Sequence, residues 1–210
     1  MSEDISEGFV EVSESRVFHR SLAIKGNSKN IVLMHGWSFT SKNWEEVGAF
    51  AKLSRLGFNV FSPDYPGFGL SPSSQRYAIQ RGNVGNGPLF IHDYVKTLGL
   101  QKVTVLGASM GGGMAISFAI EMPEMVESVI AVAPAWIERK KDQLRNISKP
   151  VMFIWGSQDT VVPVSLGPEY SALVRGSRLK IIDGAKHPAY LDKPEEFFAS
   201  VEDFLRSLPS

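Results

Sequence analysis

The sequence predicts an α/β fold in which a doubly wound, mostly parallel sheet is entered through an antiparallel hairpin. Short runs of β-branched residues alternate with amphipathic stretches, which is typical of parallel strands joined by crossover helices. Ahead of this alternation, two closely spaced runs at 9–13 and 16–24 predict a pair of hairpin strands. The chain has 210 residues, enough for one domain with a continuous core. We therefore expect a single domain over residues 1–210.

The alternation of strands and helices continues along the rest of the chain. Buried strands are expected at 31–34, 59–61, 103–106, 129–132, 151–155 and 179–182. Apolar residues at helical spacing predict helices at 41–56, 89–98, 110–120 and 195–205. Gly57 follows the first of these helices and Pro123 the third, as helix-stop signals do. Sheets of this kind gather their chemistry at the carboxyl ends of the strands, so functional residues are expected at that edge.

The composition excludes several classes of function. The 22 basic and 22 acidic residues give zero formal net charge, so nothing predicts capture of nucleic acid or of an anionic membrane. The sequence contains no cysteine, which excludes a disulfide framework, a thiol nucleophile and a thiolate metal site. No cluster of metal ligands is evident in the sequence, and we expect no cofactor.

The start of the chain lacks the features of a secretion signal. Residues 1–8 are acidic and carry neither a basic region nor an apolar core. No apolar run in the sequence is long enough to span a bilayer. We therefore expect a cytoplasmic protein that does not act at a membrane.

A nucleophile is predicted at Ser109. The motif Gly107-Ala108-Ser109-Met110-Gly111 lies between a predicted strand and a predicted helix. In that context a Gly-x-Ser-x-Gly motif places the serine on a sharp, strained turn with its hydroxyl above the sheet edge. Without the context, a serine that caps a helix in a glycine-rich turn would explain the motif. The flanking strand and helix favour the nucleophile.

A serine hydroxyl needs a base to take its proton, and the sequence offers four histidines. His187 follows the last predicted strand on a loop at the active edge, and we expect it to be the base. His35 also ends a strand, but it precedes the nucleophile, and a structural role beside its neighbouring glycine fits it better. His19 lies in the hairpin and His92 in a helical stretch, where packing or surface roles are expected.

The base in turn needs a carboxylate that fixes its tautomer and stabilises the imidazolium. Asp159 follows the penultimate predicted strand. The chain order is then Ser, Asp, His, which is expected when the nucleophile lies on a sharp turn between a strand and a helix. Asp64 also follows a strand, but it precedes Ser109, and a structural role in its proline- and glycine-rich turn fits it better. Asp183 is too close to His187 along the chain to reach the ring easily.

Two backbone amides are expected to hold the oxyanion of a tetrahedral intermediate. Met110 N–H lies at the start of a helix, where the helix dipole favours negative charge. The second donor is predicted to be Trp37 N–H, after the strand at 31–34, although the Trp37 side chain could serve only as a wall of the pocket. Side chains that could rim the substrate site, with ordinary packing as the alternative for each, are Phe39, Phe68, Trp136, Val161 and Tyr190.

Five motifs, taken in order, resemble the successive signatures of the α/β-hydrolase superfamily. They span nearly the whole chain and are His35-Gly36-Trp37, Asp64-Tyr65-Pro66-Gly67-Phe68-Gly69, Gly107-Ala108-Ser109-Met110-Gly111, Gly156-Ser157-Gln158-Asp159 and Gly184-Ala185-Lys186-His187. The stretches 40–44 and 187–197 are in addition similar to the compact group around α/β-hydrolase domain-containing protein 14. The resemblance implies the α/β-hydrolase fold.

The predicted fold has no cap domain. Most larger members of the superfamily carry a helical cap after the strand that precedes Pro134. Here only residues 135–149 separate that strand from the next, and a connection of that length holds one short helix at most. We therefore expect a shallow, open site with little to enclose a long acyl chain.

The expected activity is hydrolysis of small or short-acyl esters, so the expected partner is a small-molecule ester. His187 would take the proton of Ser109, which attacks the acyl carbon to form an acyl-enzyme. Protonation of His187 should make activity fall in mild acid. Two alternatives stay open. One is an acyltransferase or perhydrolase with the same triad, and the other is a non-catalytic receptor or interaction module on a hydrolase scaffold.

Overall fold

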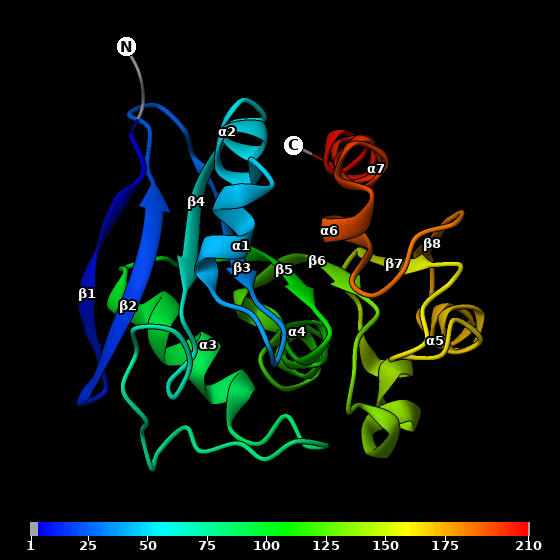
Figure 1. Ribbon diagram of the computed structural model, residues 1–210, viewed down its shortest axis with the longest axis horizontal. Helices are drawn as coiled ribbons and strands as arrows, with labels where there is room; N and C mark the ends of the chain where they lie inside the picture. The colour runs from blue at the N-terminus through cyan, green and yellow to red at the C-terminus, as the bar shows by residue number, and fades with distance from the viewer. Residues whose placement is uncertain (1–3, 210) are drawn as a thin grey trace.

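One eight-stranded sheet organises the computed structural model, which describes residues 4–209. The strand order is β1-β2-β4-β3-β5-β6-β7-β8 (Figure 1). The strands are β1 Ser6–Val12, β2 Ser15–Leu22, β3 Lys29–Met34, β4 Phe58–Pro63, β5 Val103–Ala108, β6 Val126–Val132, β7 Val151–Gly156 and β8 Arg178–Ile182. The acidic start of the chain, on which the expectation of no leader depends, lies partly outside the described residues.

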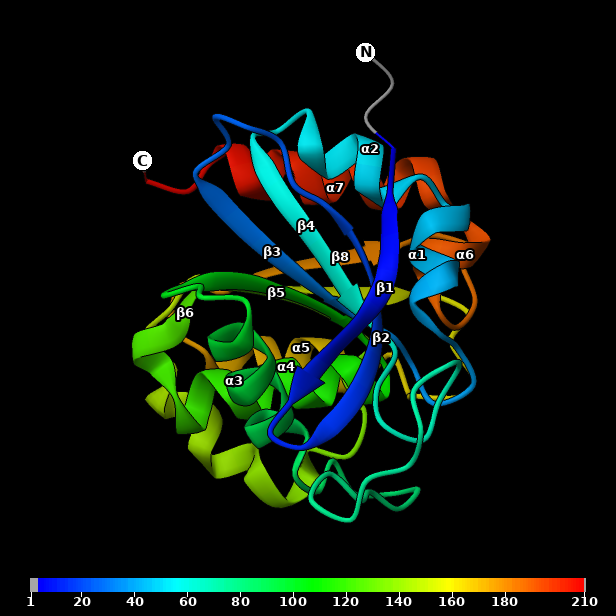
Figure 2. The ribbon, with the colours of Figure 1, turned by 90° about the vertical axis from the view of Figure 1, so that its left-hand side faces the viewer.

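The pairing of the strands confirms the predicted doubly wound sheet. β1 pairs antiparallel with β2, and β2 pairs antiparallel with β4, so the hairpin forms one edge of the sheet (Figure 2). From β4 to β8 every pairing is parallel. Every residue of β5 and of β7 is buried, as expected for central parallel strands that are covered on both faces.

Helices cover both faces of the sheet. Figure 1 shows α3, α4 and α5 on one face, with α1, α2, α6 and α7 on the other. The helices are α1 Ser41–Glu46, α2 Ala49–Ser54, α3 Gly87–Thr97, α4 Met110–Glu121, α5 Leu166–Leu173, α6 Ala189–Asp192 and α7 Pro194–Arg206, with 3₁₀ helices at Pro123–Met125 and Glu138–Asn146. Each helix layer buries its own apolar cluster against the sheet, and we call these clusters the α3–α5 core and the α1–α7 core.

One predicted helix is wrong in its extent. The apolar spacing predicted a single helix over 41–56, but the structure has two short helices, α1 and α2, with a turn between them. Gly48 in that turn has φ 73°, a left-handed conformation that interrupts an α-helix and that glycine adopts at little cost. Both helices still bury apolar side chains in the α1–α7 core, which explains why the spacing continues through the break.

The connection between β6 and β7 agrees with the expected absence of a cap. Within it, the only helix of the described chain is the 3₁₀ helix Glu138–Asn146, whose Lys140 and Lys141 form ion pairs with Glu121 and Glu169. These contacts tie the connection to α4 and α5. The connection therefore lies against the domain, and no separate lid is built from it.

A buried carboxylate fastens the long connection between β4 and α3. Asp93 on α3 accepts hydrogen bonds from the Tyr77 hydroxyl at 2.7 Å, the Arg76 guanidinium at 2.8 Å and His92 Nδ1 at 2.8 Å. Burial alone would raise the pKa of Asp93. The hydrogen bonds from Tyr77, His92 and Arg76, together with the Arg76 charge, outweigh burial and lower its pKa to about 2. Asp93 is therefore an ionised anchor for this connection.

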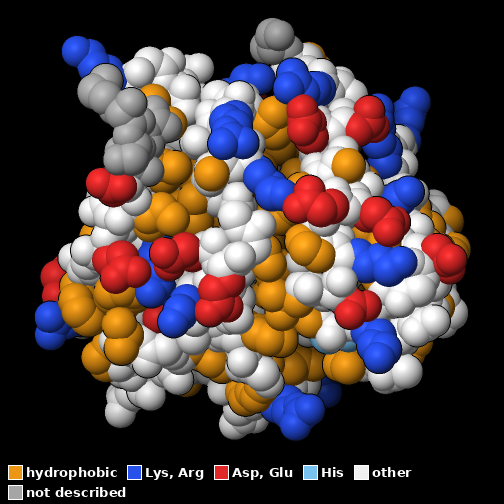
Figure 3. Space-filling model, turned by 45° about the horizontal axis from the view of Figure 1, so that its top comes forward, with side chains coloured by type: hydrophobic (Ala, Val, Ile, Leu, Met, Phe, Trp, Pro, Cys, Tyr) orange, Lys and Arg blue, Asp and Glu red, His pale blue; other side chains and the backbone are white. Residues whose placement is uncertain are grey.

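The surface carries charges of both signs. On the face shown in Figure 3, basic and acidic side chains are interspersed, with apolar side chains between them. Between residues 4 and 209 no helix has the length and apolar character needed to cross a bilayer.

Candidate active site

Ser109 lies on a sharp turn between β5 and α4. Its backbone has φ 54° and ψ −115°, a conformation that costs a non-glycine residue about 1–3 kcal/mol. Ser109 N donates to Val132 O at 2.8 Å, and Ser109 O accepts from Gly113 N at 2.9 Å and from Ala135 N at 3.0 Å. These three bonds hold the strained residue in place, with the side chain at the carboxyl edge of the sheet.

The two glycines of the motif are required by close backbone contacts. A Cβ on Gly107 would lie 2.1 Å from the carbonyl oxygen of Gly111. A Cβ on Gly111 would lie 2.4 Å from the carbonyl oxygen of Met34 on β3. Because both clashes are with backbone, neither can be relieved by rotating a side chain. The motif spacing thus lets α4 start directly against β3 and β5.

His187 and Asp159 form a hydrogen-bonded pair at the same edge. His187 Nδ1 lies 2.7 Å from Asp159 Oδ2, and the Asp159 side chain is fully buried, while that of His187 is 7% exposed. Asp159 Oδ1 accepts from the amides of Val161 and Val162 at 2.9 Å each. One carboxylate oxygen is therefore fixed by backbone, which leaves the other to hold Nδ1–H of the imidazole. That tautomer presents Nε2 as the proton acceptor.

Backbone contacts bring the loops that carry this pair together. Gln158 N, after β7, donates to Ala185 O, after β8, at 2.9 Å. A Cβ on Gly156 would lie 2.3 Å from the same carbonyl oxygen. Since β5, β7 and β8 run parallel, Ser109, Asp159 and His187 all follow the carboxyl ends of their strands. Among the hydrogen bonds of residues 4–209 there is none between Ser109 and His187, and such bonds often tighten only when substrate binds.

The turn after β3 lies against Ser109. A Cβ on Gly36 would be 3.5 Å from Ser109 Cβ, and Phe39 N donates to Gly36 O at 3.1 Å, closing the turn. Within the described chain, the amides of Trp37 and Met110 donate no hydrogen bond to another residue. Met110 is the first residue of the 12-residue helix α4, where the dipole favours an anion.

His35 has a structural role in this turn, in agreement with its assignment from the sequence. The fully buried imidazole accepts from Tyr65 N at Nε2, at 2.9 Å, so its proton is on Nδ1, which donates to Gly36 O at 2.8 Å. Burial lowers the pKa of His35, against smaller opposing effects of the Gly36 bond and the Asp64 charge. The peptide unit is planar, so holding the Gly36 carbonyl also orients the Trp37 N–H. No local pattern in the sequence predicts this link.

Asp64 also has a structural role, as expected. Its Oδ1 accepts from Ser41 N at 2.7 Å and from Ser41 Oγ at 2.6 Å, and its Oδ2 accepts from Leu70 N at 2.9 Å. A Cβ on Gly69 would lie 2.0 Å from the same Oδ2. Asp64 therefore joins the start of α1 to the turn after β4, and the carboxylate that bonds His187 is Asp159.

The remaining rival residues have other partners. His19 Nδ1 lies 2.8 Å from the hydroxyl of Tyr94, and burial lowers the pKa of His19. His92 bonds Asp93 on α3. Asp183 accepts from the Ser157 hydroxyl at 3.1 Å.

Two of the predicted rim residues, Phe68 and Trp136, form a chain of aromatic contacts with Trp37 near Ser109. The rings of Trp37 and Phe68 are 5.2 Å apart and those of Trp37 and Trp136 are 5.4 Å apart, both edge to face. All three side chains are half-buried. Phe39 is half-buried over Gly36, at 3.1 Å from a Cβ placed there. Val161, beside Asp159, is 63% exposed.

Tyr190 does not rim the site, which corrects the prediction. Its side chain is fully buried, and its ring stacks on Trp44 with centroids 4.1 Å apart. Tyr190 follows the His187 loop, but it lies on α6, whose buried face packs into the α1–α7 core. Tyr190 is therefore a residue of the α1–α7 core, directly after the His187 loop in the chain.

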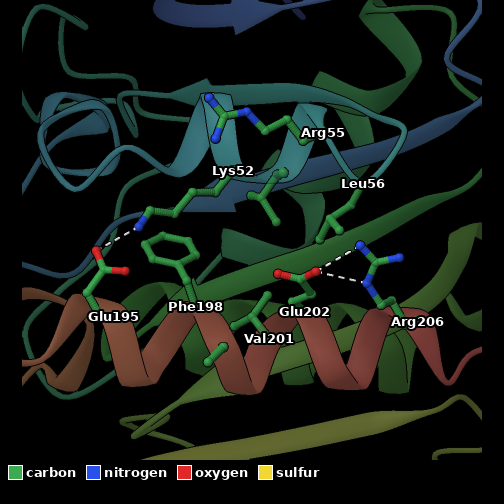
Figure 4. A pocket seen from close by; sticks show the side chains of 10 residues that line it. Lys52, Arg55, Leu56, Glu195, Phe198, Val201, Glu202 and Arg206 are labelled. Atoms are coloured by element: carbon green, nitrogen blue, oxygen red, sulfur yellow. Dashed lines mark hydrogen bonds and ion pairs between the residues drawn. The ribbon is translucent and has the colours of Figure 1, made fainter.

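A cavity of the described chain lies away from Ser109. It has a volume of about 370 Å³ and lies between α2 and α7. Its walls carry the ion pairs Lys52–Glu195 and Arg206–Glu202 (Figure 4). A neighbouring hollow is lined by Lys29 and Phe58, the first residues of β3 and β4. These hollows are thus at the amino edge of the sheet, opposite to Ser109. No group of three or more metal-ligating side chains occurs in residues 4–209.

Comparison with known proteins gives consistent likenesses. A family described as "alpha/beta hydrolase fold" matches residues 29–144 and 135–194. "Protein ABHD14A" of Danio rerio is 30% identical over 179 residues, which cover 85% of this chain and 64% of that protein, so the chain spans less than two thirds of it. "Putative protein-lysine deacylase ABHD14B" of Rattus norvegicus is 28% identical, and the match covers 98% of both chains.

A solved structure resembles the whole domain. The "predicted CIB-like hydrolase from Thermoplasma acidophilum" has 45% sequence identity and a TM-score of 0.95, and the match covers 98% of this chain and 99% of that one.

Proposed function

The chain belongs to the alpha/beta hydrolase fold family, and on that premise we propose that it is a serine hydrolase of small esters that uses a Ser109–His187–Asp159 triad. Membership confirms the resemblance found in the five motifs, and the matched relatives confirm the likeness to the group around α/β-hydrolase domain-containing protein 14. The observation that carries the proposal is the 2.7 Å bond between His187 Nδ1 and Asp159 Oδ2, at the sheet edge where Ser109 occupies its strained turn.

The proposed reaction has two halves. In the first, Nε2 of His187 takes the Ser109 proton, Ser109 Oγ attacks the acyl carbon, and the carbon–oxygen bond to the alcohol breaks as His187 returns the proton to it. In the second, His187 takes a proton from water, whose oxygen attacks the acyl-enzyme, and Ser109 recovers its proton as the acid leaves. The amides of Trp37 and Met110 stabilise the oxyanion of both tetrahedral intermediates.

The test is hydrolysis of p-nitrophenyl esters from acetate to octanoate by the wild type, Ser109→Ala and Ser200→Ala. Ser200 lies on α7 and bonds Glu196 O, so it is a matched serine far from the nucleophile. We expect turnover of short esters by the wild type and Ser200→Ala, and none by Ser109→Ala. Equal turnover by all three proteins, or none by the wild type, would remove the esterase proposal.

A second substrate class is favoured by the name of one relative. Removal of an acyl group from a lysine side chain uses the same acyl-enzyme, with an amine as leaving group in place of an alcohol. The relative named as a protein-lysine deacylase matches 98% of this chain, and the short β6–β7 connection leaves the site uncapped. An Nε-acetyl-lysine peptide should therefore be assayed beside the esters, with release of acetate and appearance of the free lysine side-chain amine in the peptide as the readout.

The two alternatives from the sequence are separated in the same assays. Added alcohol, amine or peroxide should divert product from the free acid if the protein is an acyltransferase or perhydrolase. A ligand receptor would instead retain an ester tightly with slow turnover. Product analysis on the wild type distinguishes the three outcomes.

A further inference from the structure

Beside Ser109, an aromatic group packs on one face of the sheet and the segment that carries His187 packs on the other. Trp37, Phe68 and Trp136, which we call the aromatic shelf, pack against the α3–α5 core. The segment that carries His187 packs on the opposite face, where its neighbours Ala185 and Ala189 belong to the α1–α7 core. The shelf and the segment that carries the base therefore pack on opposite faces of the sheet, one on each side of the strand that ends at Ser109.

The shelf is attached directly to the catalytic turn. Trp37 follows Gly36, whose Cβ would be 3.5 Å from Ser109 Cβ. Trp136 follows Ala135, whose amide donates to Ser109 O at 3.0 Å. A Cβ on Gly113 would lie 2.0 Å from Ala135 O, so the segment is pressed onto the first turn of α4. A group bound on the shelf is thus held next to Ser109.

The segment that presents Trp136 is strained. Trp136 has φ 65° and Ala133 has φ 40°, both in the left-handed region that favours glycine and strains other residues. Ala133 N is held by Ile154 O at 2.8 Å. A bulky residue in this conformation is uncommon, and such strain gathers at functional sites. Here its effect is to place an indole ring edge to face against Trp37.

We propose that the aromatic shelf binds the acyl group of the substrate and favours acyl groups with a flat aromatic face, such as benzoyl. The inference rests on the proposed ester hydrolysis. His187 must return its proton to the leaving group, so the leaving group lies on the His187 side of Ser109. The acyl group then lies on the opposite side, which is the side of the shelf.

The chemistry of the shelf selects the acyl class. Its three rings are half-buried, so each still offers surface to a ligand. A further ring packed against them gains about 0.5–1.5 kcal/mol per aromatic pair beyond the area that it buries. The methyl of an acetyl group on the shelf gains only the contact area that it buries. Loss of one shelf ring should therefore reduce kcat/KM for benzoyl esters about 2- to 13-fold relative to acetyl esters.

The test uses ethyl esters, because their leaving group is not aromatic. Ethyl acetate and ethyl benzoate are compared, by release of acid, for the wild type, Trp136→Leu and Phe68→Leu. The matched control is Phe9→Leu, since Phe9 is an exposed aromatic on β1 that packs on Phe18. We expect the benzoate-to-acetate ratio of kcat/KM to fall in both shelf variants and to stay at the wild-type value in Phe9→Leu.

A second pair of esters tests whether the shelf binds the acyl group and not the leaving group. Phenyl acetate and ethyl acetate differ only in the leaving group, and their ratio should stay unchanged in Trp136→Leu and Phe68→Leu. If that ratio falls, or if benzoate and acetate lose activity equally, the shelf does not bind the acyl group and the inference is overturned.

Binding of boronic acids separates this failure from failure of the proposed function. Phenylboronic and methylboronic acids form adducts with an activated serine and carry the acyl substituent alone, so they need no turnover. Tighter binding of phenylboronic acid by the wild type, reduced in Trp136→Leu, supports the shelf. Turnover of acetate without this preference overturns the shelf and leaves the esterase intact. If the wild type shows no turnover and binds no boronic acid, both the shelf and the esterase proposal are overturned.

Discussion

Replacing Ser109 by glycine should make the protein more stable than replacing it by alanine. Both variants lose the hydroxyl, so they differ only in Cβ and in backbone freedom. At φ 54° and ψ −115°, a residue with Cβ has a strain of about 1–3 kcal/mol. Glycine adopts the mirror image of the β region without that strain. Its greater freedom in the unfolded chain costs about 0.5–1 kcal/mol.

The difference between these two effects is a net stabilisation of Ser109→Gly over Ser109→Ala by about 1 kcal/mol. For a chain of this length, that free energy corresponds to a rise in Tm of about 2–4 °C. Urea unfolding followed by circular dichroism gives the free energy of unfolding, and a thermal melt gives Tm. Both variants should lack esterase activity.

The same pair of substitutions at Ser200 is the control. Ser200 is a residue of helix α7, where glycine is less stable than alanine by about 1 kcal/mol. The order of stability should therefore reverse between the two positions. If Ser109→Gly is equal to or less stable than Ser109→Ala, the strain assigned to the nucleophile turn is refuted.

Three further predictions address the acid, the anchor of the long connection and the turn. Asp159→Asn should lower kcat for esters by about 10⁴ through loss of the His187 tautomer, and steady-state kinetics that retain most of kcat would contradict that role. Asp93→Asn should lower the free energy of unfolding at pH 7 by about 1–2 kcal/mol, because the lowered pKa of about 2 stabilises the fold wherever Asp93 is ionised. That contribution is complete above the unfolded pKa and is lost as pH falls towards 2, so urea melts of variant and wild type should converge there, and a constant gap would oppose the reasoning. Gly111→Ala places Cβ 2.4 Å from Met34 O and should destabilise by about 1–3 kcal/mol, so an unchanged Tm would show that the turn can relax.

Much of the fold could be predicted from local patterns. The strand at 103–106 and the helix at 110–120 differ from β5 and α4 only at their ends, because buried parallel strands and amphipathic helices have distinct periods. The break between α1 and α2 was missed for a physical reason. Gly48 changes the backbone direction, but both helices bury their apolar faces in the same core, so the apolar spacing carries no sign of the turn.

The sequence by itself determined which residues follow which strand. Since parallel strands share one carboxyl edge, the positions of Ser109, Asp159 and His187 at strand ends were enough to predict that all three lie at that edge. Chain order and strand polarity are local properties, and they do not depend on side-chain packing.

Only the tertiary structure decided on which face of the sheet each neighbouring side chain lies. Tyr190 and Trp136 are both aromatic residues near strand ends, yet one is fully buried in the α1–α7 core and the other is half-buried beside Ser109. The link from His35 through Gly36 to the Trp37 amide likewise depends on Tyr65 of another turn. Such contacts join residues far apart in the chain, so they are set by how the helices pack on the sheet, which local periodicity does not encode.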